Sequence, residues 1–191
     1  MYNKVVVPLD GSKLAEVVLP HLKDIIAAFK IKEVMLVSVT EKVKGRVSTQ
    51  AQEKFVFEHP VIDAPPQVVA SQYVVYWTRI GVPHEIPMTI GKMARTAAAY
   101  LCKIAEGLGQ TGCDTTVSVL VGDPAEEVVR FVEDKGADLI LMASRGKTGF
   151  SRWDMGNIAE KVIKATRATV MLVKPEPGFK ETKAKRRGIS S

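Results

Sequence analysis

Short runs of aliphatic and β-branched residues alternate along this chain with longer stretches in which apolar residues recur at helical spacing. The runs are continuously apolar, which is typical of strands that are buried on both faces of a parallel sheet. They predict five strands, at residues 4–9, 34–39, 115–121, 138–143 and 169–174.

The stretches between these runs predict four helices. Asp123 and Pro124 are typical of a helix start, because they supply an N-cap followed by proline at the first helical position. Gly136 is expected to end that helix. Pro20 lies inside the first helical pattern, where it predicts a kink or a later start. The expected helices cover residues 14–29, 94–108, 124–135 and 157–166.

Strands that alternate with helices imply right-handed crossovers. We therefore expect a doubly wound α/β domain over residues 1–175, with an open five-stranded parallel sheet and helices on both faces. Residues 41–93 form an insertion after the second strand that is longer than ordinary connections. It is interpreted either as a lid or dimerisation arm, or as an insertion whose aromatic segment, 68–80, packs on the domain.

Charge and composition narrow the class of protein. The chain has 191 residues, 46% hydrophobic and 25% charged, with a net charge of +6, which is typical of a globular protein. No apolar run approaches the roughly 18–20 residues of a membrane span, and the amino terminus does not resemble a secretory signal. Two cysteines without a histidine cluster make a disulfide framework or zinc site a poor interpretation, which favours the cytoplasm.

Half of the net positive charge lies in the last sixteen residues, 176–191. Five basic residues stand there against two acidic ones, so the segment carries 5 − 2 = +3. It has no apolar periodicity, and we interpret it as a disordered basic tail. A solvated tail is favoured over one that binds nucleic acid or anionic lipid. The tail residues concerned are Lys180, Lys183, Lys185, Arg186, Arg187, Glu176 and Glu181.

Three segments are expected to meet at the carboxyl ends of the strands, where open α/β sheets bind ligands. Asp10 follows the first strand, Val39 ends the second, and a loop of residues 143–156 follows the fourth. Glycines in that loop allow a close approach of backbone N–H groups, and the next helix directs its N-terminus at the same place. The loop and helix start contribute Ala143, Arg145, Gly146, Lys147, Gly149, Arg152, Gly156, Asn157 and Ile158.

This combination favours a nucleotide, with the Asp10 carboxylate on ribose hydroxyls and the loop on phosphates. The alternative is purely structural: the loop glycines only shape a turn, Gly156 only precedes an N-cap, and Asp10 only caps the first helix. A P-loop is excluded, because Leu141 stands where that motif requires glycine. The chemistry alone leaves both interpretations open.

Catalytic chemistry has little support in the sequence. The three histidines, His21, His59 and His84, are scattered and none adjoins a nucleophile, so no acid–base group emerges. Cys102 and Cys113 are interpreted as inert thiols. We therefore expect no catalytic residues and no metal site, and a protein that holds its ligand rather than an efficient hydrolase.

The motifs together resemble the universal stress protein family. The resemblance rests on Val5–Ser12, Gly122–Pro124, 137–142, the loop with Gly156, and 168–173, and it covers about residues 3–40 and 94–175. The ATP-binding branch of that family has glycine, two residues, glycine, nine residues, glycine, then serine or threonine. This chain instead begins the pattern with Ala143 and ends it with Asn157.

The resemblance implies a Rossmann-like nucleotide fold and a site for ATP, with or without Mg²⁺. It implies that Asp10 contacts the ribose, that Pro8, next to Leu9, lines the adenine side, and that the Val39 backbone meets the adenine. Gly146 and Gly156 match the phosphate-loop glycines. Asn157 takes the hydroxyl position, where its amide either donates to a phosphate or caps the helix with Glu160 completing a capping box.

We therefore expect a cytoplasmic, universal stress protein-like module that binds ATP and acts as a stress or energy-state sensor. The edge strand at 169–174 and the resemblance both favour a homodimer through that strand. Two alternatives stay open, a non-nucleotide interaction protein of the same fold and a slow ATP-hydrolysing or adenylylating enzyme.

Overall fold

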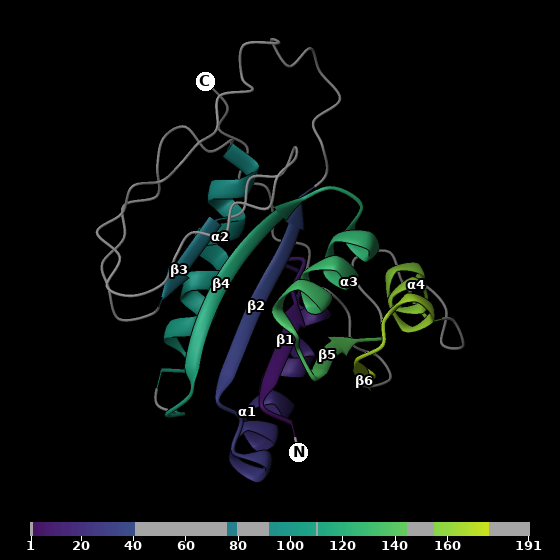
Figure 1. Ribbon diagram of the computed structural model, residues 1–191. Coiled ribbons are helices and arrows are strands. Elements are labelled where there is room, and N and C mark those ends of the chain that lie inside the picture. Colours follow the sequence, from purple (N-terminus) through teal and green to yellow (C-terminus); the bar gives the residue numbers. More distant parts are fainter. Residues whose placement is uncertain (1, 41–75, 80–91, 110, 145–154, 176–191) are drawn as a thin grey trace, which may run out of the picture.

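The computed structural model describes residues 2–40, 76–79, 92–109, 111–144 and 155–175, and its architecture is a single twisted sheet between two layers of helices (Figure 1). The sheet has the strand order β3-β4-β2-β1-β5-β6. Its strands are β1 (Lys4–Pro8), β2 (Glu33–Thr40), β3 (Tyr76–Arg79), β4 (Asp114–Val121), β5 (Leu139–Ala143) and β6 (Thr169–Val173).

The helices connect these strands in the order that the sequence predicts. They are the 3-10 turn η1 (Ala15–Val17) and the helices α1 (Val18–Phe29), α2 (Lys92–Glu106), α3 (Pro124–Lys135) and α4 (Asn157–Ala165). The chain runs outward from β1 through β2 to β4, crosses back to the other side of β1 as β5, and continues to β6. The strand order therefore reverses between β1 and β5, as in a doubly wound sheet.

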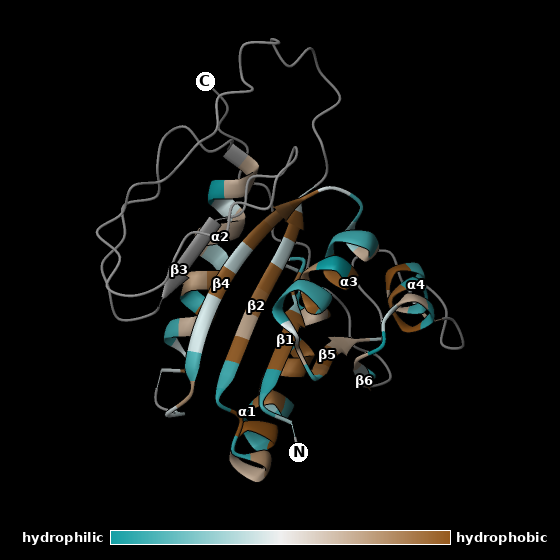
Figure 2. Ribbon diagram, in the orientation of Figure 1, coloured by the Kyte–Doolittle hydropathy of each residue, from teal (hydrophilic) through white to brown (hydrophobic). Residues whose placement is uncertain are grey.

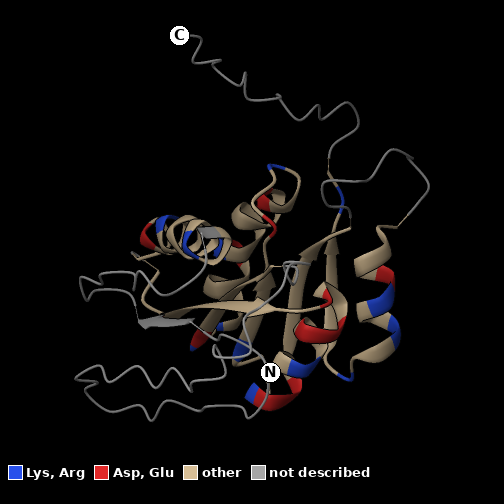
Figure 3. Ribbon diagram, turned by 90° about the horizontal axis from the view of Figure 1, so that it is seen from above, with Lys and Arg blue, Asp and Glu red and all other residues tan. Residues whose placement is uncertain are grey.

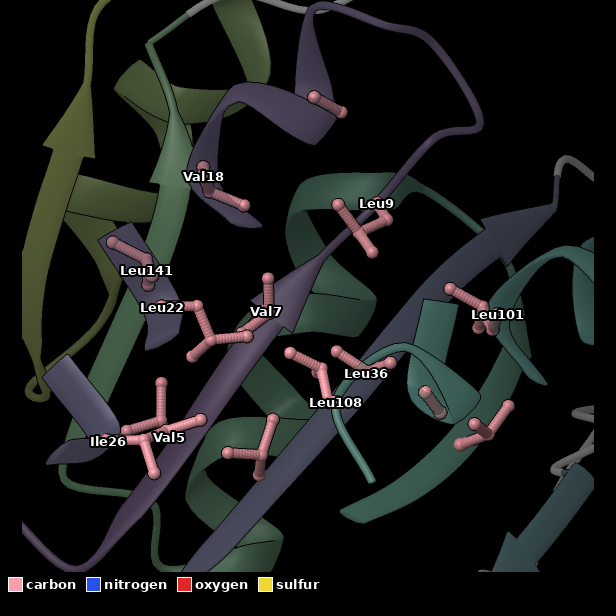
Figure 4. Packing of buried hydrophobic residues seen from close by; sticks show 14 of the residues in the cluster. Val5, Val7, Leu9, Val18, Leu22, Ile26, Leu36, Leu101, Leu108 and Leu141 are labelled. Atoms are coloured by element: carbon pink, nitrogen blue, oxygen red, sulfur yellow. The ribbon is translucent and has the colours of Figure 1, made fainter. Parts of the chain in front are cut away.

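Side chains of successive strand residues point to opposite faces, which divides the core in two. In β1, Val5 and Val7 pack toward α1 and α2, whereas Val6 packs toward α3 and α4. Figure 4 shows the first cluster, in which Leu22 of α1 and Leu36 of β2 surround Val7. Val5, Val6 and Val7 are each 0% exposed, which explains their continuous apolar run.

Polarity follows this layered arrangement. β1 and β2 are hydrophobic over most of their length, whereas β4 begins with polar residues at its outer position in the parallel sheet (Figure 2). Seen from above, the charged residues lie mainly on the helices (Figure 3). Among the described helices, none combines the length and apolar character that crossing a bilayer would require.

The five parallel strands of the prediction are all present, and their pairing is parallel throughout, from Val5 opposite Val34 to Leu139 opposite Thr169. One strand goes beyond the prediction. Residues Tyr76–Arg79 of the insertion form β3, which adds to β4 in antiparallel orientation. These four residues therefore extend the sheet edge; the rest of the insertion, and the basic tail, lie outside the described residues.

Two local predictions about helices are confirmed. Pro20 lies in the first turn of α1, where its missing N–H is not needed, and the chain before it forms η1 instead. The side chain of Asp123 caps α3 by accepting hydrogen bonds from Ala125 N at 3.0 Å and Glu126 N at 3.2 Å. Pro124 follows it as the first helical residue, and Gly136 ends the helix.

Candidate functional site

The carboxyl ends of β1 and β5 lie side by side, because the two strands are adjacent and parallel. Leu9 continues the β1 ladder by donating its N–H to Val37 O at 2.8 Å. Its side chain is 2% exposed and points into the core, so only its backbone borders the strand end (Figure 4). Pro8 ends β1 and is partly exposed at the same edge.

Asp10 is held in the first loop by Ser12. The Ser12 N–H donates to Asp10 Oδ1 at 2.9 Å, and the Ser12 hydroxyl donates to the same oxygen at 2.6 Å. Gly11 between them has φ +79°, a conformation that favours glycine and turns Ser12 back toward Asp10. The carboxylate is thus fixed in direction at the end of β1.

The structural alternative in which Asp10 only caps the first helix does not hold. The N-cap residues of η1 and α1 are Leu14 and Val17, and neither has a side-chain cap bond. The N–H of Ala15 instead donates to Ser12, to its hydroxyl oxygen at 3.1 Å and to its carbonyl oxygen at 3.1 Å. Ser12 rather than Asp10 therefore completes the helix start, and the Asp10 carboxylate accepts from Ser12.

The phenol of Tyr100 lies near the carboxylates of Glu16 and Asp10. Tyr100 of α2 has a hydroxyl that is buried without a hydrogen-bond partner of good geometry in the described part of the chain. Burial first, and then the neighbouring carboxylates of Glu16 and Asp10, raise the pKa of Tyr100 well above its ordinary value. The phenol therefore stays in its neutral form at physiological pH.

The end of β2 supplies the apolar side of the site. Val39 is partly buried and packs on the core beneath α3 and α4. Thr40 closes the strand end: its hydroxyl donates to Leu120 O at 3.2 Å, and its carbonyl accepts from Gly122 N at 3.0 Å. These bonds join the ends of β2 and β4 and fix the position of the Val39 backbone.

The end of β5 leads to the N-terminus of α4. Ala143 is 8% exposed and ends the strand, and Ser144 N donates to Val173 O at 2.8 Å. The Ser144 carbonyl accepts from Gly156 N at 2.8 Å, and this bond joins the end of β5 to the start of α4. Arg145, Gly146, Lys147, Gly149 and Arg152, the predicted phosphate-binding residues and cations of that loop, lie outside the described residues.

At the start of α4, the structure excludes one role left open for Asn157 and corrects the expected direction of the Gly156 N–H. Gly156 is itself the N-cap, without a side-chain cap bond, so Asn157 is the first helical residue and does not cap the helix with Glu160. The Gly156 N–H is donated to Ser144 and so does not point at a ligand. The first helical bond runs from Glu160 N to Gly156 O, which leaves the N–H groups of residues 157–159 outside the helix's own ladder.

Three of these residues were not predicted as site residues from the sequence. Ser12 carries a recognisable signal, because aspartate and serine two positions apart around a glycine are typical of a side-chain-stabilised turn. Ser144 contributes through its backbone, which carries no signal in the sequence. Tyr100 reaches the site only because α2 packs beside η1, and no local pattern predicts that contact.

Three of the five groups considered for catalysis, His21, Cys102 and Cys113, lie among the described residues. His21 is exposed on α1, whereas His59 and His84 lie outside the described residues. Cys102 and Cys113 are both free and half-buried, and burial raises the pKa of the Cys102 thiol. Within the described ranges, no three His, Cys, Asp or Glu side chains are close enough to hold a metal ion.

The fold and site define a doubly wound α/β domain with a carboxylate after the first strand and a helix N-terminus after the strand beside it. The family model of the universal stress proteins matches residues 61–174, which include β4, α3, β5, α4 and β6. The chain belongs to the universal stress protein family.

Individual relatives agree with this assignment. Universal stress protein MJ0577 of Methanocaldococcus jannaschii is 28% identical over 174 residues, which covers 91% of this chain and 96% of that protein. A solved structure of MJ0577 matches with a TM-score of 0.62 at 26% identity, covering 92% of this chain and 98% of that one.

Two solved structures of the same fold carry ligands. A universal stress protein in complex with cAMP matches with a TM-score of 0.54 at 17% identity, covering 91% of this chain and 97% of that one. A family protein from Arabidopsis thaliana with AMP bound matches with a TM-score of 0.53 at 12% identity, covering 91% and 92%. At these identities the likeness concerns the fold alone.

Proposed function

We propose that this protein binds ATP in the cleft at the carboxyl ends of β1, β2 and β5, and that it acts as a nucleotide-responsive stress or energy-state module. The observation that carries the proposal is the fixed Asp10 carboxylate at the point where the strand order reverses. The AMP and cAMP found in other proteins of this fold support an adenine nucleotide as the ligand.

The described residues fit each part of an adenine nucleotide. Asp10 supplies an acceptor for ribose hydroxyls, and Val39 supplies an apolar wall with backbone groups for the base. The α4 N-terminus offers the N–H groups of residues 157–159 and a favourable dipole for phosphate. The Asn157 amide does not cap α4 and is proposed to donate to a phosphate there. Bound ATP would supply the phosphate charge that these donors compensate.

Binding rather than turnover is the better proposal for this site. Among the described residues, no group of His, Cys, Asp and Glu side chains could hold a metal ion. A Mg²⁺ ion accompanying ATP would therefore depend mainly on the phosphates themselves, as Mg²⁺ commonly does. The nucleotide is proposed to change the protein's conformation or choice of partner in the cytoplasm.

Thermal unfolding with ATP, with GTP and without ligand tests the nucleotide proposal. At 100 times the Kd, a ligand adds about 2.7 kcal/mol to the free energy of unfolding, which raises Tm by about 5–10 °C for a chain of this size. ATP is expected to produce this shift. If millimolar ATP leaves Tm unchanged, the alternative of an interaction protein with a degenerate cleft replaces the proposal.

We further propose that the protein forms a homodimer through β6. Among the described strands, β6 is an edge that pairs only with β5. Thr169 N donates to Asp138 O and Val173 O accepts from Ser144 N, so alternate residues of β6 face β5. The backbone groups of Val170 and Leu172 therefore point away from the sheet, where a second copy of β6 is proposed to pair with them.

A further inference from the structure

Ser12 connects the candidate ribose-binding carboxylate to the start of the first helix. It is 1% exposed, although its side chain is polar. Its hydroxyl lies 2.6 Å from Asp10 Oδ1 and 3.1 Å from Ala15 N, and its carbonyl accepts from Ala15 N at 3.1 Å and Glu16 N at 3.3 Å. The hydroxyl and the backbone carbonyl of Ser12 thus both stabilise the turn.

The direction of the Ser12 hydroxyl proton follows from its two neighbours. The Ala15 N–H is a donor only, so the hydroxyl oxygen must accept there. An ionised carboxylate accepts only, so the single hydroxyl proton must be donated to Asp10. Short hydrogen bonds from a hydroxyl to a carboxylate are among the stronger ones in proteins. The Ser12 hydroxyl and N–H together hold one oxygen of Asp10 and fix the plane of the carboxylate.

We propose that Ser12 is the positioning residue that lets the cleft distinguish ribonucleotides from nucleotides without ribose hydroxyls. The proposal rests on the nucleotide-binding function proposed above and assigns the source of its sugar specificity. A carboxylate that rotates freely loses entropy when it binds the two hydroxyls, whereas a carboxylate held by Ser12 has already lost it. Losing the Ser12 hydroxyl therefore weakens the contact that depends on ribose and spares contacts to base and phosphate.

The chain offers a matched control for this serine. Ser118 of β4 is also 1% exposed, but its hydroxyl has no hydrogen-bond partner in the described part of the structure. Ser118→Ala therefore removes the same atom from an equally buried position without changing Asp10. Ser12→Cys provides a second variant at the site, because it keeps the side-chain shape while replacing the hydroxyl by a much weaker donor.

The experiment is isothermal titration of ATP and of 2′,3′-dideoxy-ATP into the full chain and each variant, after circular dichroism has shown that each is folded. The wild type is expected to prefer ATP by about tenfold or more, the value of a hydrogen bond to a charged group. In Ser12→Ala and Ser12→Cys, ATP is expected to bind about five- to tenfold more weakly, with dideoxy-ATP changed less than about twofold. Ser118→Ala is expected to keep the wild-type preference.

The outcomes separate this inference from the proposed function. No binding of ATP by the wild type overturns both. Equal binding of ATP and dideoxy-ATP by the wild type overturns the role of Ser12 alone. A preference that survives in both Ser12 variants overturns it too, as does an equal loss of preference in Ser118→Ala. If Ser12→Ala does not fold, the Ser12→Cys titration decides alone.

Discussion

Two buried serines show how differently one residue type contributes to this protein. The Ser12 hydroxyl donates to Asp10 and accepts from Ala15, whereas the Ser118 hydroxyl is buried without a described partner. A buried polar group without a hydrogen bond is destabilising, because it loses its bonds to water and gains none. The same substitution should therefore have opposite effects on stability at the two positions.

Ser12→Ala is expected to lower the free energy of unfolding by about 1–2 kcal/mol, because it leaves the Ala15 N–H and the Asp10 carboxylate with one bond fewer. Ser118→Ala is expected to leave the free energy unchanged or to raise it by up to about 1 kcal/mol. Urea titration of the three proteins measures both effects. An equal loss in the two variants would contradict the hydrogen-bond assignments.

At the opposite end of β1 from Asp10, a second aspartate, Asp138, also accepts backbone hydrogen bonds. Its Oδ2 accepts hydrogen bonds from Asn3 N and Lys4 N, each at 2.9 Å, and so joins the start of β1 to β5. These two N–H groups are the main reason that the pKa of Asp138 lies below its ordinary value in the folded protein. The charged carboxylate, rather than the neutral acid, is the form that the fold favours.

The lowered pKa of Asp138 makes its contribution to stability depend on pH. The contribution is fully present above the unfolded pKa, near 4, and is lost as pH falls through the folded pKa. Asp138→Asn is expected to cost about 1 kcal/mol at pH 7, a modest value because the group is partly exposed. Urea unfolding at pH 7 and at pH 3 should show this difference shrinking in acid. A difference that grows in acid would contradict the assignment.

At the scale of elements, the helix starts depend on short turns whose details decide the chemistry of the site. The prediction of α3 succeeded because Asp123 and Pro124 carry the signal locally. Capping of α4 by Asn157, one of two roles that the sequence left open for it, is excluded because the N-cap is the preceding residue, Gly156, whose N–H bonds to the carbonyl of Ser144. That bond spans the loop between β5 and α4, so no local pattern predicts it.

The turn from β4 to α3 gives a prediction at this scale. A Cβ on Gly122 would lie 2.7 Å from Cγ and Oε1 of Glu127, which is 4% exposed and paired with Arg130 at 3.4 Å. Gly122→Ala is therefore expected to lower the free energy of unfolding by about 1–3 kcal/mol through overpacking. Thermal or urea unfolding measures the change.

The double variant Gly122→Ala with Glu127→Ala identifies the cause of that loss. If the clash with Glu127 is responsible, the two substitutions should not be additive, because truncating Glu127 removes the atoms that the new methyl group meets. Additive losses would show that Gly122 is needed for another reason.

At the scale of the whole molecule, the sequence predicted the layers better than the site. Continuous apolar runs such as Val5–Val7 reveal a strand buried on both faces, so the five parallel strands were predicted. β3 was not, because its pairing with β4 joins segments about forty residues apart. Asp10 and Val39 were predicted at the strand ends, whereas Tyr100 depends on helix packing and the phosphate loop lies outside the described residues.

The proposed dimer gives a prediction for the whole assembly. Val170→Pro removes a backbone N–H that points away from β5, so it is expected to abolish the dimer while the sheet stays intact. Val170→Ala shortens the side chain but keeps the N–H, and it is expected to remain dimeric. Light scattering coupled to size-exclusion chromatography measures the mass of each. A monomeric wild type, or a Val170→Pro dimer, would contradict the β6 interface.

Asp10 and the neighbouring strand ends are proposed to form an ATP site. Calorimetric titration of ATP into the wild type, Asp10→Ala and Asp24→Ala tests it most directly, since Asp24 is an exposed aspartate on α1 and serves as the matched control. We expect one site per chain with a Kd below about 100 μM, with affinity unchanged in Asp24→Ala and at least about tenfold weaker in Asp10→Ala. Absence of saturable binding at millimolar ATP, or equal affinity in Asp10→Ala, would contradict it.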